Sequence, residues 1–390
     1  MLANVLVACG YDVTREYYIN DAGVQVYKLL QSVRKSAGKA ADKIVEYSGG
    51  YIADLASKAK SLDRDDREAS QELVEIVIND LIKPAVKKMG IKFDVWTKES
   101  SVASDKAVAE ALSRLESKNL IKKDKGGTIW LITPEDARKE RVLIKADGTR
   151  SYLLNDIAYH LDVFKNRKFN KAIKIWGADH AGQVNSLAYA VKKLVEKDAL
   201  DYVVMQIVRL LKQGKEVKVS KRAGNIITID DLLAEVESDV ARFFFLMRSS
   251  DTHMDFDLDL AKEESQKNPY WYIMYAYTRA QSIKKQAAKL KLTTATSIST
   301  LKPIERSMIR HLSKLPSLVQ TIGTEAFYEV HKLTFYGMEL AKIFHDFYEQ
   351  DRIIKLPQGQ AAEKLYLIDK FITAMKVYWQ LLGIAPKDRM

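Results

Sequence analysis

The 390-residue sequence contains a single cysteine and no long apolar segment. Because Cys9 has no partner in the chain, an internal disulfide is excluded, which fits a protein kept in a reducing cytosol. No apolar run approaches the roughly 20 residues that a membrane-spanning helix requires, and the N-terminal stretch lacks the basic leader of a signal peptide. No His or Cys spacing typical of a zinc site occurs. We therefore expect a cytoplasmic protein that does not enter membranes and holds no tightly bound metal or organic cofactor.

The composition favours a globular protein with an acidic polymer as its partner. Hydrophobic residues make up 47% of the chain, and its length suggests two or three domains. The formal net charge is +11, which is typical of proteins that bind nucleic acid. A solvated lysine-rich surface is the alternative interpretation of this charge. The 19 tyrosines, several of them near basic residues toward the C-terminus, favour stacking on unpaired bases.

The order of predicted elements changes once along the chain. Up to Lys262, short apolar runs alternate with helical patterns, which predicts a doubly wound α/β domain. In such folds ligands bind in loops at the carboxyl ends of strands, here after the predicted strands 171–176 and 202–210. From Tyr270 onward nearly every segment has a helical pattern. We therefore expect an α/β domain over residues 1–262 and an all-helical domain over residues 263–390.

A basic loop follows the second of these strands. Lys218, Ser220 and Lys221 stand within four residues, ahead of Gly224 and a capped helix. A short loop of this kind can close over a triphosphate and neutralise the charge that develops during attack on it. An exposed basic turn is the alternative, and this segment alone does not decide between the two.

Two further segments carry candidate ligand-binding groups. Gly177 would let a ligand approach the backbone, and Asp179 and His180 follow it, so that Asp179 could accept ribose hydroxyls. A structural histidine is the alternative for His180. Tyr152 and Asp156 stand four apart on a predicted helix and share a face, which suits a guanidinium that needs a carboxylate and a flat ring. An acidic residue stabilising the helix N-terminus is the alternative there.

Taken in order, these segments resemble arginyl-tRNA synthetases, a class I aminoacyl-tRNA synthetase family, over nearly the whole chain. The segments that carry the resemblance are residues 15–23 (REYYINDAG), 47–52 (YSGGYI), 93–100 (FDVWTKES), 152–160 (YLLNDIAYH), 177–180 (GADH), the lysine loop, 241–246 (ARFFFL), 255–259 (DFDLD), 265–269 (SQKNP) and 381–384 (LLGI) with the terminal Met390.

The resemblance implies an arginine-tRNA ligase. Arginine and ATP with Mg²⁺ would form arginyl-adenylate, and the arginyl group would pass to the 3′-terminal adenosine of the cognate tRNA. The fold implied is a Rossmann-type catalytic domain, with an insertion around residues 40–145, followed by a helical anticodon-binding domain in a monomeric enzyme. By position, arginine would be held by Tyr152, Asp156, Glu99 and Gln183, and ATP by Gly177, Asp179 and His180 with Lys218, Ser220 and Lys221 as catalytic residues. Candidates for tRNA contact are Tyr275, Tyr277, Arg279, Tyr378, Trp379 and Met390, with core packing as the alternative for each aromatic residue.

The sequence departs from the family pattern at its start. The His-x-Gly-His signature of class I enzymes occurs nowhere in the 390 residues, the first histidine being His160. From the family pattern we expect these residues to lack the N-terminal domain and the first Rossmann strand. We therefore expect this chain to activate arginine poorly and to be poorly stable alone, because strands next to the missing one would expose apolar edges. We interpret the chain as an arginyl-tRNA synthetase, or a fragment of one, whose sequence is incomplete; the alternatives are a non-catalytic tRNA-binding paralogue and another class I synthetase, such as a cysteinyl enzyme. The lysine loop argues against the first and the lack of zinc-ligand cysteines against the second.

Overall fold

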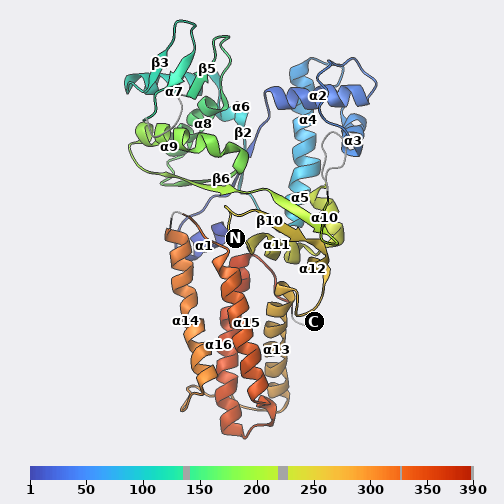
Figure 1. Cartoon of the computed structure of the whole chain (residues 1–390), viewed down its shortest axis with the longest axis vertical. Coiled ribbons are helices and arrows are strands. Elements are labelled where there is room, and N and C mark those ends of the chain that lie inside the picture. Colours follow the sequence, from blue (N-terminus) through green and yellow to red (C-terminus); the bar gives the residue numbers. More distant parts are fainter. Residues whose placement is uncertain (135–140, 218–226, 326, 388–390) are drawn as a thin grey trace.

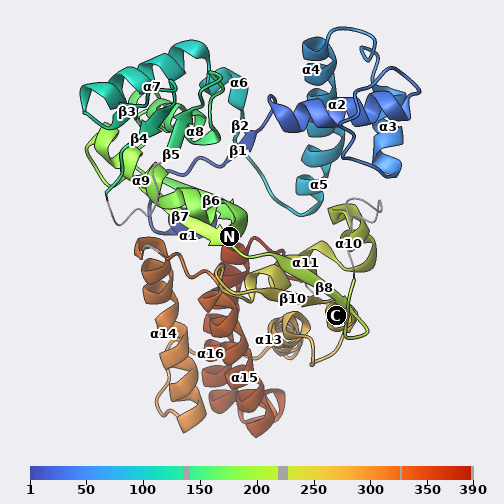
Figure 2. The same ribbon diagram turned by 45° about the horizontal axis from the view of Figure 1, so that its top comes forward.

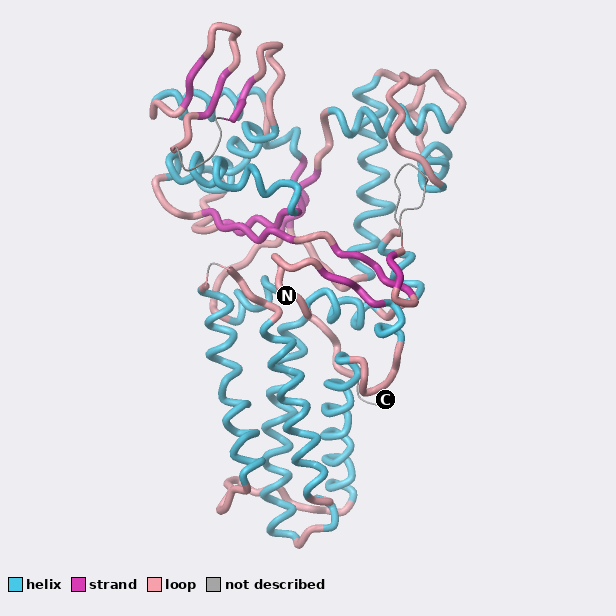
Figure 3. The backbone as a smooth tube through the Cα atoms, in the orientation of Figure 1, coloured by secondary structure: helices cyan, strands magenta, loops and turns pink. Residues whose placement is uncertain are grey.

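The computed structural model describes residues 1–134, 141–217, 227–325 and 327–387. Two lobes, residues 24–88 and 99–195, stand side by side above a long helical bundle (Figure 1). A layer of strands and short helices lies between the lobes and the bundle (Figure 3). This arrangement places the chain segments that carry the predicted site residues near the centre of the molecule.

The parallel strands form two separate pairs. β1 (Glu16–Ile19) pairs with β2 (Val95–Lys98), and β6 (Ala172–Gly177) pairs with β7 (Leu200–Met205). Within the described residues no ladder of hydrogen bonds joins the two pairs. Ile175 of β6 is 61% exposed, so this strand presents an apolar side chain to solvent. The alternation of strands and helices agrees with the predicted α/β domain.

The lobe of residues 99–195 is built on three amphipathic helices. α7 (Asp105–Ser117), α8 (Tyr152–Leu161) and α9 (Ala181–Val195) bury their apolar faces against one another. The hydroxyl of Ser151 caps α8 by accepting a hydrogen bond from the Leu154 backbone N–H at 3.4 Å. An antiparallel sheet that the sequence did not predict in full lies outside them. The strands of this sheet are β3 (Ile121–Lys123), β4 (Ile129–Leu131) and β5 (Arg141–Ile144). The remaining short elements of the lobe are α6 (Glu99–Val102), η3 (Asp162–Asn166) and η4 (Ala178–His180).

The second lobe is helical and has small cores of its own. Asp65 caps its central helix, because its carboxylate accepts hydrogen bonds from the backbone N–H groups of Arg67 and Glu68 at 2.9 Å. The continuous helical segment over residues 66–88 contains a π-helical turn. The elements are α2 (Val24–Ser36), α3 (Gly50–Lys58), α4 (Asp66–Ile76), η1 (Val77–Ile82) and α5 (Lys83–Lys88).

The central layer follows β7 in the chain. The strand predicted over residues 202–210 is two strands, β7 and β8, and β8 pairs in parallel with a strand that the sequence did not predict. Thr228 and Asp231 form the reciprocal capping box expected at the next helix. The elements are β8 (Val208–Lys212), β9 (Lys215–Glu216), α10 (Ile229–Glu235), α11 (Ser238–Leu246), β10 (Met254–Asp257) and α12 (Leu258–Lys262).

The remainder is a helical bundle, as predicted. Its largest core also takes in Val5 and Phe243, so the apolar packing continues across the domain boundary predicted at Lys262. α1, which contains Val5, lies at the end of the bundle nearest the lobes (Figure 2). The elements are α1 (Leu2–Ala8), α13 (Pro269–Lys289), α14 (Pro303–Thr324), α15 (Lys332–Gln350), η6 (Ile353–Lys355) and α16 (Gln358–Leu382).

Arg242 on α11 fastens the bundle to the rest of the molecule. Its guanidinium donates one hydrogen bond to the Leu382 carbonyl at 2.9 Å and another to the Met89 carbonyl at 2.6 Å. Gly383, just beyond α16, has a φ of +69°, and a Cβ there would lie 2.5 Å from the Arg242 Nη2 atom. Glycine is therefore required at this position both by the left-handed backbone and by the close approach of the guanidinium.

Candidate functional site

A group of charged and polar side chains, of which Glu99 is buried and the others are half-buried, lies where the two strand pairs approach each other. The first pair contributes Tyr18 on β1 and Glu99 at the start of α6, which directly follows β2. The second contributes Lys174 on β6, and the neighbouring α8 contributes Asp156. We call this group the acidic cluster; its members are Tyr18, Glu99, Asn155, Asp156, Lys174, Trp176 and Tyr202.

The acidic cluster has two carboxyl groups and one cation. Glu99 is 8% exposed and accepts a hydrogen bond from Asn155 Nδ2 at 2.8 Å. Asp156 forms an ion pair with Lys174 through its Oδ1 atom. Burial raises the pKa of Glu99 and that of Asp156, and the Lys174 ammonium opposes the shift at Asp156. His160 adds no charge, because burial lowers its pKa to about 3. With both carboxylates ionised, the group is therefore one positive charge short of neutrality.

Two polar atoms of the acidic cluster are buried without a hydrogen-bond partner. They are the Oδ1 atom of Asn155, whose amide nitrogen is used by Glu99, and the hydroxyl of Tyr202 on β7. The Tyr202 ring lies 5.6 Å from the Trp176 ring, and burial, followed by the charge of Asp156, raises the pKa of its hydroxyl. Buried polar atoms are almost always hydrogen-bonded, so unpartnered ones beside a charge imbalance indicate where a ligand supplies the missing groups.

Aromatic rings surround the one cation. The Lys174 Nζ atom lies 4.1 Å from the centroid of the Trp176 ring, 5.9 Å from that of Tyr159 and 6.0 Å from that of Tyr18. Each distance is within the range of a cation–π attraction. Burial lowers the pKa of Lys174, and Asp156 opposes that shift. The surroundings therefore accommodate a positive charge between flat rings and a carboxylate.

An ion pair holds the two halves of the acidic cluster in register. Arg167, just after η3, places its Nη2 atom 2.7 Å from an oxygen of Glu16 on β1. Beside α6, the Asp21 carboxylate accepts hydrogen bonds from the backbone N–H and the hydroxyl of Ser100 at 2.9 and 2.5 Å. Neither contact was predicted from the sequence, although Glu16 and Asp21 belong to the segment that carries the family resemblance.

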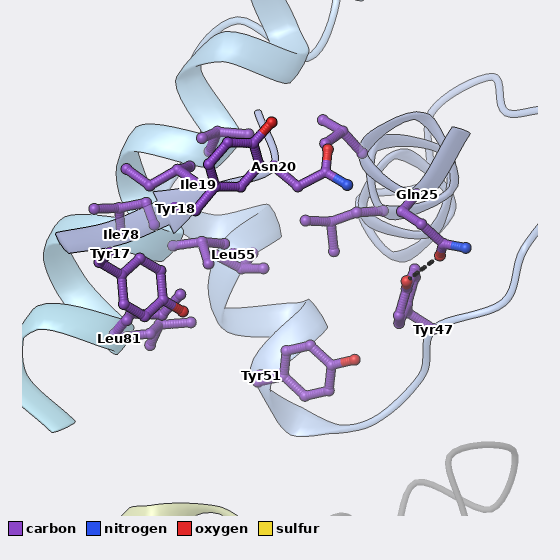
Figure 4. Close-up of a pocket in the computed structure, with 15 residues that line it drawn as sticks. Tyr17, Tyr18, Ile19, Asn20, Gln25, Tyr47, Tyr51, Leu55, Ile78 and Leu81 are labelled. Carbon is purple, nitrogen blue, oxygen red and sulfur yellow. Dashed lines mark hydrogen bonds between the residues drawn. The ribbon is translucent and has the colours of Figure 1, made fainter. Parts of the chain in front are cut away.

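A tyrosine-lined pocket of about 440 Å³ lies beside β1 (Figure 4). Tyr18 belongs to both features. The Tyr47 hydroxyl donates a hydrogen bond to Gln25 Oε1 at 2.7 Å across the pocket wall. The rest of the lining is largely apolar and comes from β1, α2, α3, α4 and η1. The helical lobe therefore shapes one approach to the acidic cluster.

The predicted nucleotide-binding residues follow β6, as the sequence analysis expected. Asp179 and His180 are 76% and 53% exposed, and their side chains approach to 3.5 Å. The His180 ring lies 5.5 Å from the ring of Trp176, so this segment adjoins the acidic cluster. A Cβ on Gly177 would lie 2.6 Å from Asp179 Oδ1, so glycine there makes room for the carboxylate.

The remaining predicted residues of the α/β domain do not belong to the acidic cluster. Tyr152 is 52% exposed at the first position of α8, outside the acidic cluster. Gln183 lies half-buried in the first turn of α9. The structure thus brings Glu99 and Asp156 together and leaves Tyr152 at the surface. Lys218, Ser220 and Lys221, and the terminal Met390, lie outside the described residues.

The aromatic residues predicted to contact tRNA divide into two groups. Tyr277, Tyr378 and Trp379 are at most 2% exposed and pack in the bundle core, which is the alternative role stated for them. They offer no surface for a base to stack on. Arg279, in contrast, lies half-buried with its guanidinium 4.2 Å from the Tyr275 ring centroid and 4.6 Å from that of Tyr348. Tyr348 was not predicted from the sequence.

The described part of the chain has neither a metal-ion cluster nor a membrane-spanning helix. Among residues 1–134, 141–217, 227–325 and 327–387, no group of three or more His, Cys, Asp or Glu side chains is arranged to hold a metal ion. Within the same residues, every helix is too short or too polar to cross a membrane.

Comparisons with known proteins identify the family. Residues 1–245 match the model of the class I (R) tRNA synthetase catalytic domain, and residues 273–390 match that of the DALR anticodon binding domain. The whole chain is 36% identical to the arginine–tRNA ligase of Geobacillus thermodenitrificans and 34% identical to that of Heliobacterium modesticaldum, covering 73% of each.

Solved structures show the same architecture. A Campylobacter jejuni chain assigned to the arginyl-tRNA synthetases superposes on the whole of this chain with a TM-score of 0.83 at 29% identity, over 88% of its own length. The Thermus thermophilus arginyl-tRNA synthetase, at 16% identity and a TM-score of 0.75 over 78% of its length, shares the fold. The α/β catalytic domain and the helical anticodon-binding domain expected from the sequence are therefore confirmed. The chain belongs to the arginyl-tRNA synthetase family of class I aminoacyl-tRNA ligases.

Proposed function

We propose that the acidic cluster binds the side chain of L-arginine. The observation that carries this proposal is the shortage of one positive charge beside the buried, unpartnered Asn155 Oδ1 atom and Tyr202 hydroxyl. A guanidinium has a fixed positive charge and five N–H donors in one plane, so it supplies both the charge and the hydrogen bonds. Its charge would also keep Glu99 and Asp156 ionised against the effect of burial.

ATP with Mg²⁺ would bind as a substrate beside this group. Asp179, in the exposed segment that begins at Gly177, would accept hydrogen bonds from the ribose, and His180 would contact the nucleotide. Lys218 and Lys221 would then neutralise the charge of the phosphates, and Ser220 would contact them through its hydroxyl. The arginine carboxylate attacks the α-phosphorus, the bond between that phosphorus and the α,β-bridging oxygen breaks, and pyrophosphate leaves. No side chain acts as a nucleophile, so catalysis consists of positioning and electrostatic stabilisation.

The arginyl group would then be transferred to tRNA. The 3′-terminal adenosine hydroxyl attacks the acyl carbon of arginyl-adenylate, and AMP leaves. We propose the bundle as the site of anticodon-arm binding, with the half-buried Arg279 and the rings of Tyr275 and Tyr348 as a surface for a base or phosphate. A bound base would stack on this group, whereas the buried rings of the core would hold the helices together.

We further propose that a polypeptide of these 390 residues activates arginine poorly while it still binds tRNA. Two features support this: the sequence contains no His-x-Gly-His, and the described parallel strands form two pairs instead of one sheet. Each missing contact to the transition state is worth on the order of a hundredfold in rate. A non-catalytic tRNA-binding function is the second candidate, and the split sheet favours it.

Charging of arginine tRNA with labelled arginine and ATP tests this part of the proposal. We expect charging near background together with tRNA binding that weakens steeply as salt is raised. Charging at the rate of an intact synthetase would overturn the expected impairment. Loss of salt-sensitive tRNA binding would overturn the role given to the bundle. Arg279→Met is the informative variant for the bundle, with Arg306→Met in α14 as a control on the same domain.

A further inference from the structure

The position of Lys174 has a consequence for amino-acid selection. Its ammonium occupies the place where an incoming cation would meet Asp156: it contacts the Oδ1 atom of that carboxylate and lies over the Trp176 ring. Its side chain is only 16% exposed, so the ammonium lies inside the protein and not in solvent. A substrate cation that uses Asp156 must therefore compete with a cation of the chain itself.

We propose that Lys174 is a specificity-determining residue, an internal competitor that favours a guanidinium over an ammonium as the substrate side chain. The inference rests on the proposed function of the acidic cluster as the arginine site. A substrate lysine would replace one ammonium by another at Asp156, so the exchange would contribute no free energy of binding. Arginine can pair with a carboxylate through two N–H groups, and its remaining donors can reach the unpartnered acceptors.

The two unpartnered polar atoms of the acidic cluster explain why arginine is favoured over lysine. An ammonium carries three donors on one atom, whereas a guanidinium spreads five donors over a plane. Asn155 Oδ1 and the Tyr202 hydroxyl come from α8 and from β7, on different elements. A planar, extended donor set is better suited to serve both while it also contacts a carboxylate. Both amino acids must displace the Lys174 ammonium from Asp156, and only arginine makes enough new hydrogen bonds to offset the free energy lost. Specificity for arginine arises from this difference.

Calorimetric titration of the 390-residue chain with L-arginine, L-lysine and the uncharged L-citrulline tests the proposal. The variants are Lys174→Met, which removes the competitor, and Lys174→Arg, which supplies a permanent guanidinium. Lys192→Met is the matched control, because Lys192 is 58% exposed and pairs with the exposed Asp198. Thermal unfolding of each variant, measured in parallel, shows whether it is folded.

We expect Lys174→Met to strengthen lysine binding more than arginine binding, so that the arginine-to-lysine affinity ratio falls roughly tenfold. Lys174→Arg should weaken arginine binding by a similar factor, and the control should change neither. Opposite effects of the two variants on arginine separate competition from structural damage, which would weaken binding in both. If Lys174→Met does not fold, Lys174→Gln, which also removes the ammonium, takes its place with the same expectation.

Two results would overturn the inference, and they are distinguishable. If the wild-type chain prefers arginine to citrulline but the arginine-to-lysine ratio is unchanged in Lys174→Met, or arginine binding is unchanged in Lys174→Arg, then Lys174 does not select. If the wild-type chain does not prefer arginine to citrulline, the proposed arginine site is itself wrong, and the role of Lys174 is overturned with it.

Discussion

Removal of the Arg242 guanidinium should loosen the bundle from the α/β domain. The side chain donates hydrogen bonds to the carbonyls of Leu382 and Met89, at 2.9 and 2.6 Å, in a half-buried position. A hydrogen bond from a charged group contributes about 1.5–3 kcal/mol, and Arg242→Met, which keeps the apolar stem, removes two of them. We therefore expect the free energy of unfolding to fall by about 3–6 kcal/mol, a large part of the stability of an ordinary domain.

Urea denaturation followed by circular dichroism and tryptophan fluorescence measures this loss. Because the chain has several separate cores, the quantity to compare is the first transition and its slope rather than one global value. Arg209→Met is the control, since Arg209 is 50% exposed and pairs with Asp255 at the surface, where ion pairs contribute at most about 1 kcal/mol. The reasoning is refuted if Arg242→Met shifts the first transition no more than Arg209→Met does.

Three further predictions concern single residues. His160 has a pKa of about 3 in the folded chain against 6.5 when unfolded, so the unfolded state binds the extra proton and stability falls as pH drops below 6.5. His160→Gln should remove about 2 kcal/mol of the loss between pH 6.5 and pH 5, measured by urea titration at both values; an unchanged pH dependence would contradict this. Gly383→Ala should destabilise the protein by about 1–3 kcal/mol, because the residue has a positive φ and tight surroundings. Gly359→Ala, in the open first turn of α16, should instead stabilise the protein slightly. Melting temperatures of the two variants that shift in the same direction would contradict this pair of predictions. Gly177→Ala should push the Asp179 carboxylate aside and weaken ATP binding roughly tenfold with little change in melting temperature, and unaltered binding of a fluorescent ATP analogue would argue against an ATP site there.

The sequence predicted the site best where the pattern was local. The spacing of Tyr152 and Asp156 placed both on one helix, and the resemblance gave Asp156 and Glu99 their role, so the two carboxyl groups of the acidic cluster were both named in advance. Lys174, Tyr202 and Asn155 were not named. Their importance depends on which side chains from β6, β7 and α8 are left facing one another, and that is decided by the pairing of strands distant in sequence.

In the helical bundle the sequence pattern did not distinguish buried aromatic residues from exposed ones. Tyr378 and Trp379 have the composition of a stacking surface, yet both are fully buried. A helical period places aromatic residues on a face but does not say whether that face meets solvent or another helix. The strand predicted over residues 202–210 fails for a similar reason: Gln206 lies between β7 and β8 and donates its backbone N–H to the Ser250 carbonyl at 2.9 Å, a tertiary contact that no local pattern indicates.

The central claim is that the acidic cluster recognises a guanidinium by its charge, and calorimetric titration with L-arginine and L-citrulline tests it most directly. The two ligands have nearly the same shape, and only arginine carries the positive charge that Glu99 and Asp156 lack. The account predicts that the wild-type chain prefers arginine by roughly a hundredfold, that Asp156→Asn abolishes most of this preference, and that Asp198→Asn, which alters a 74% exposed carboxylate, leaves it intact. Equal affinity of the wild-type chain for the two ligands, or a preference that survives in Asp156→Asn, would contradict it.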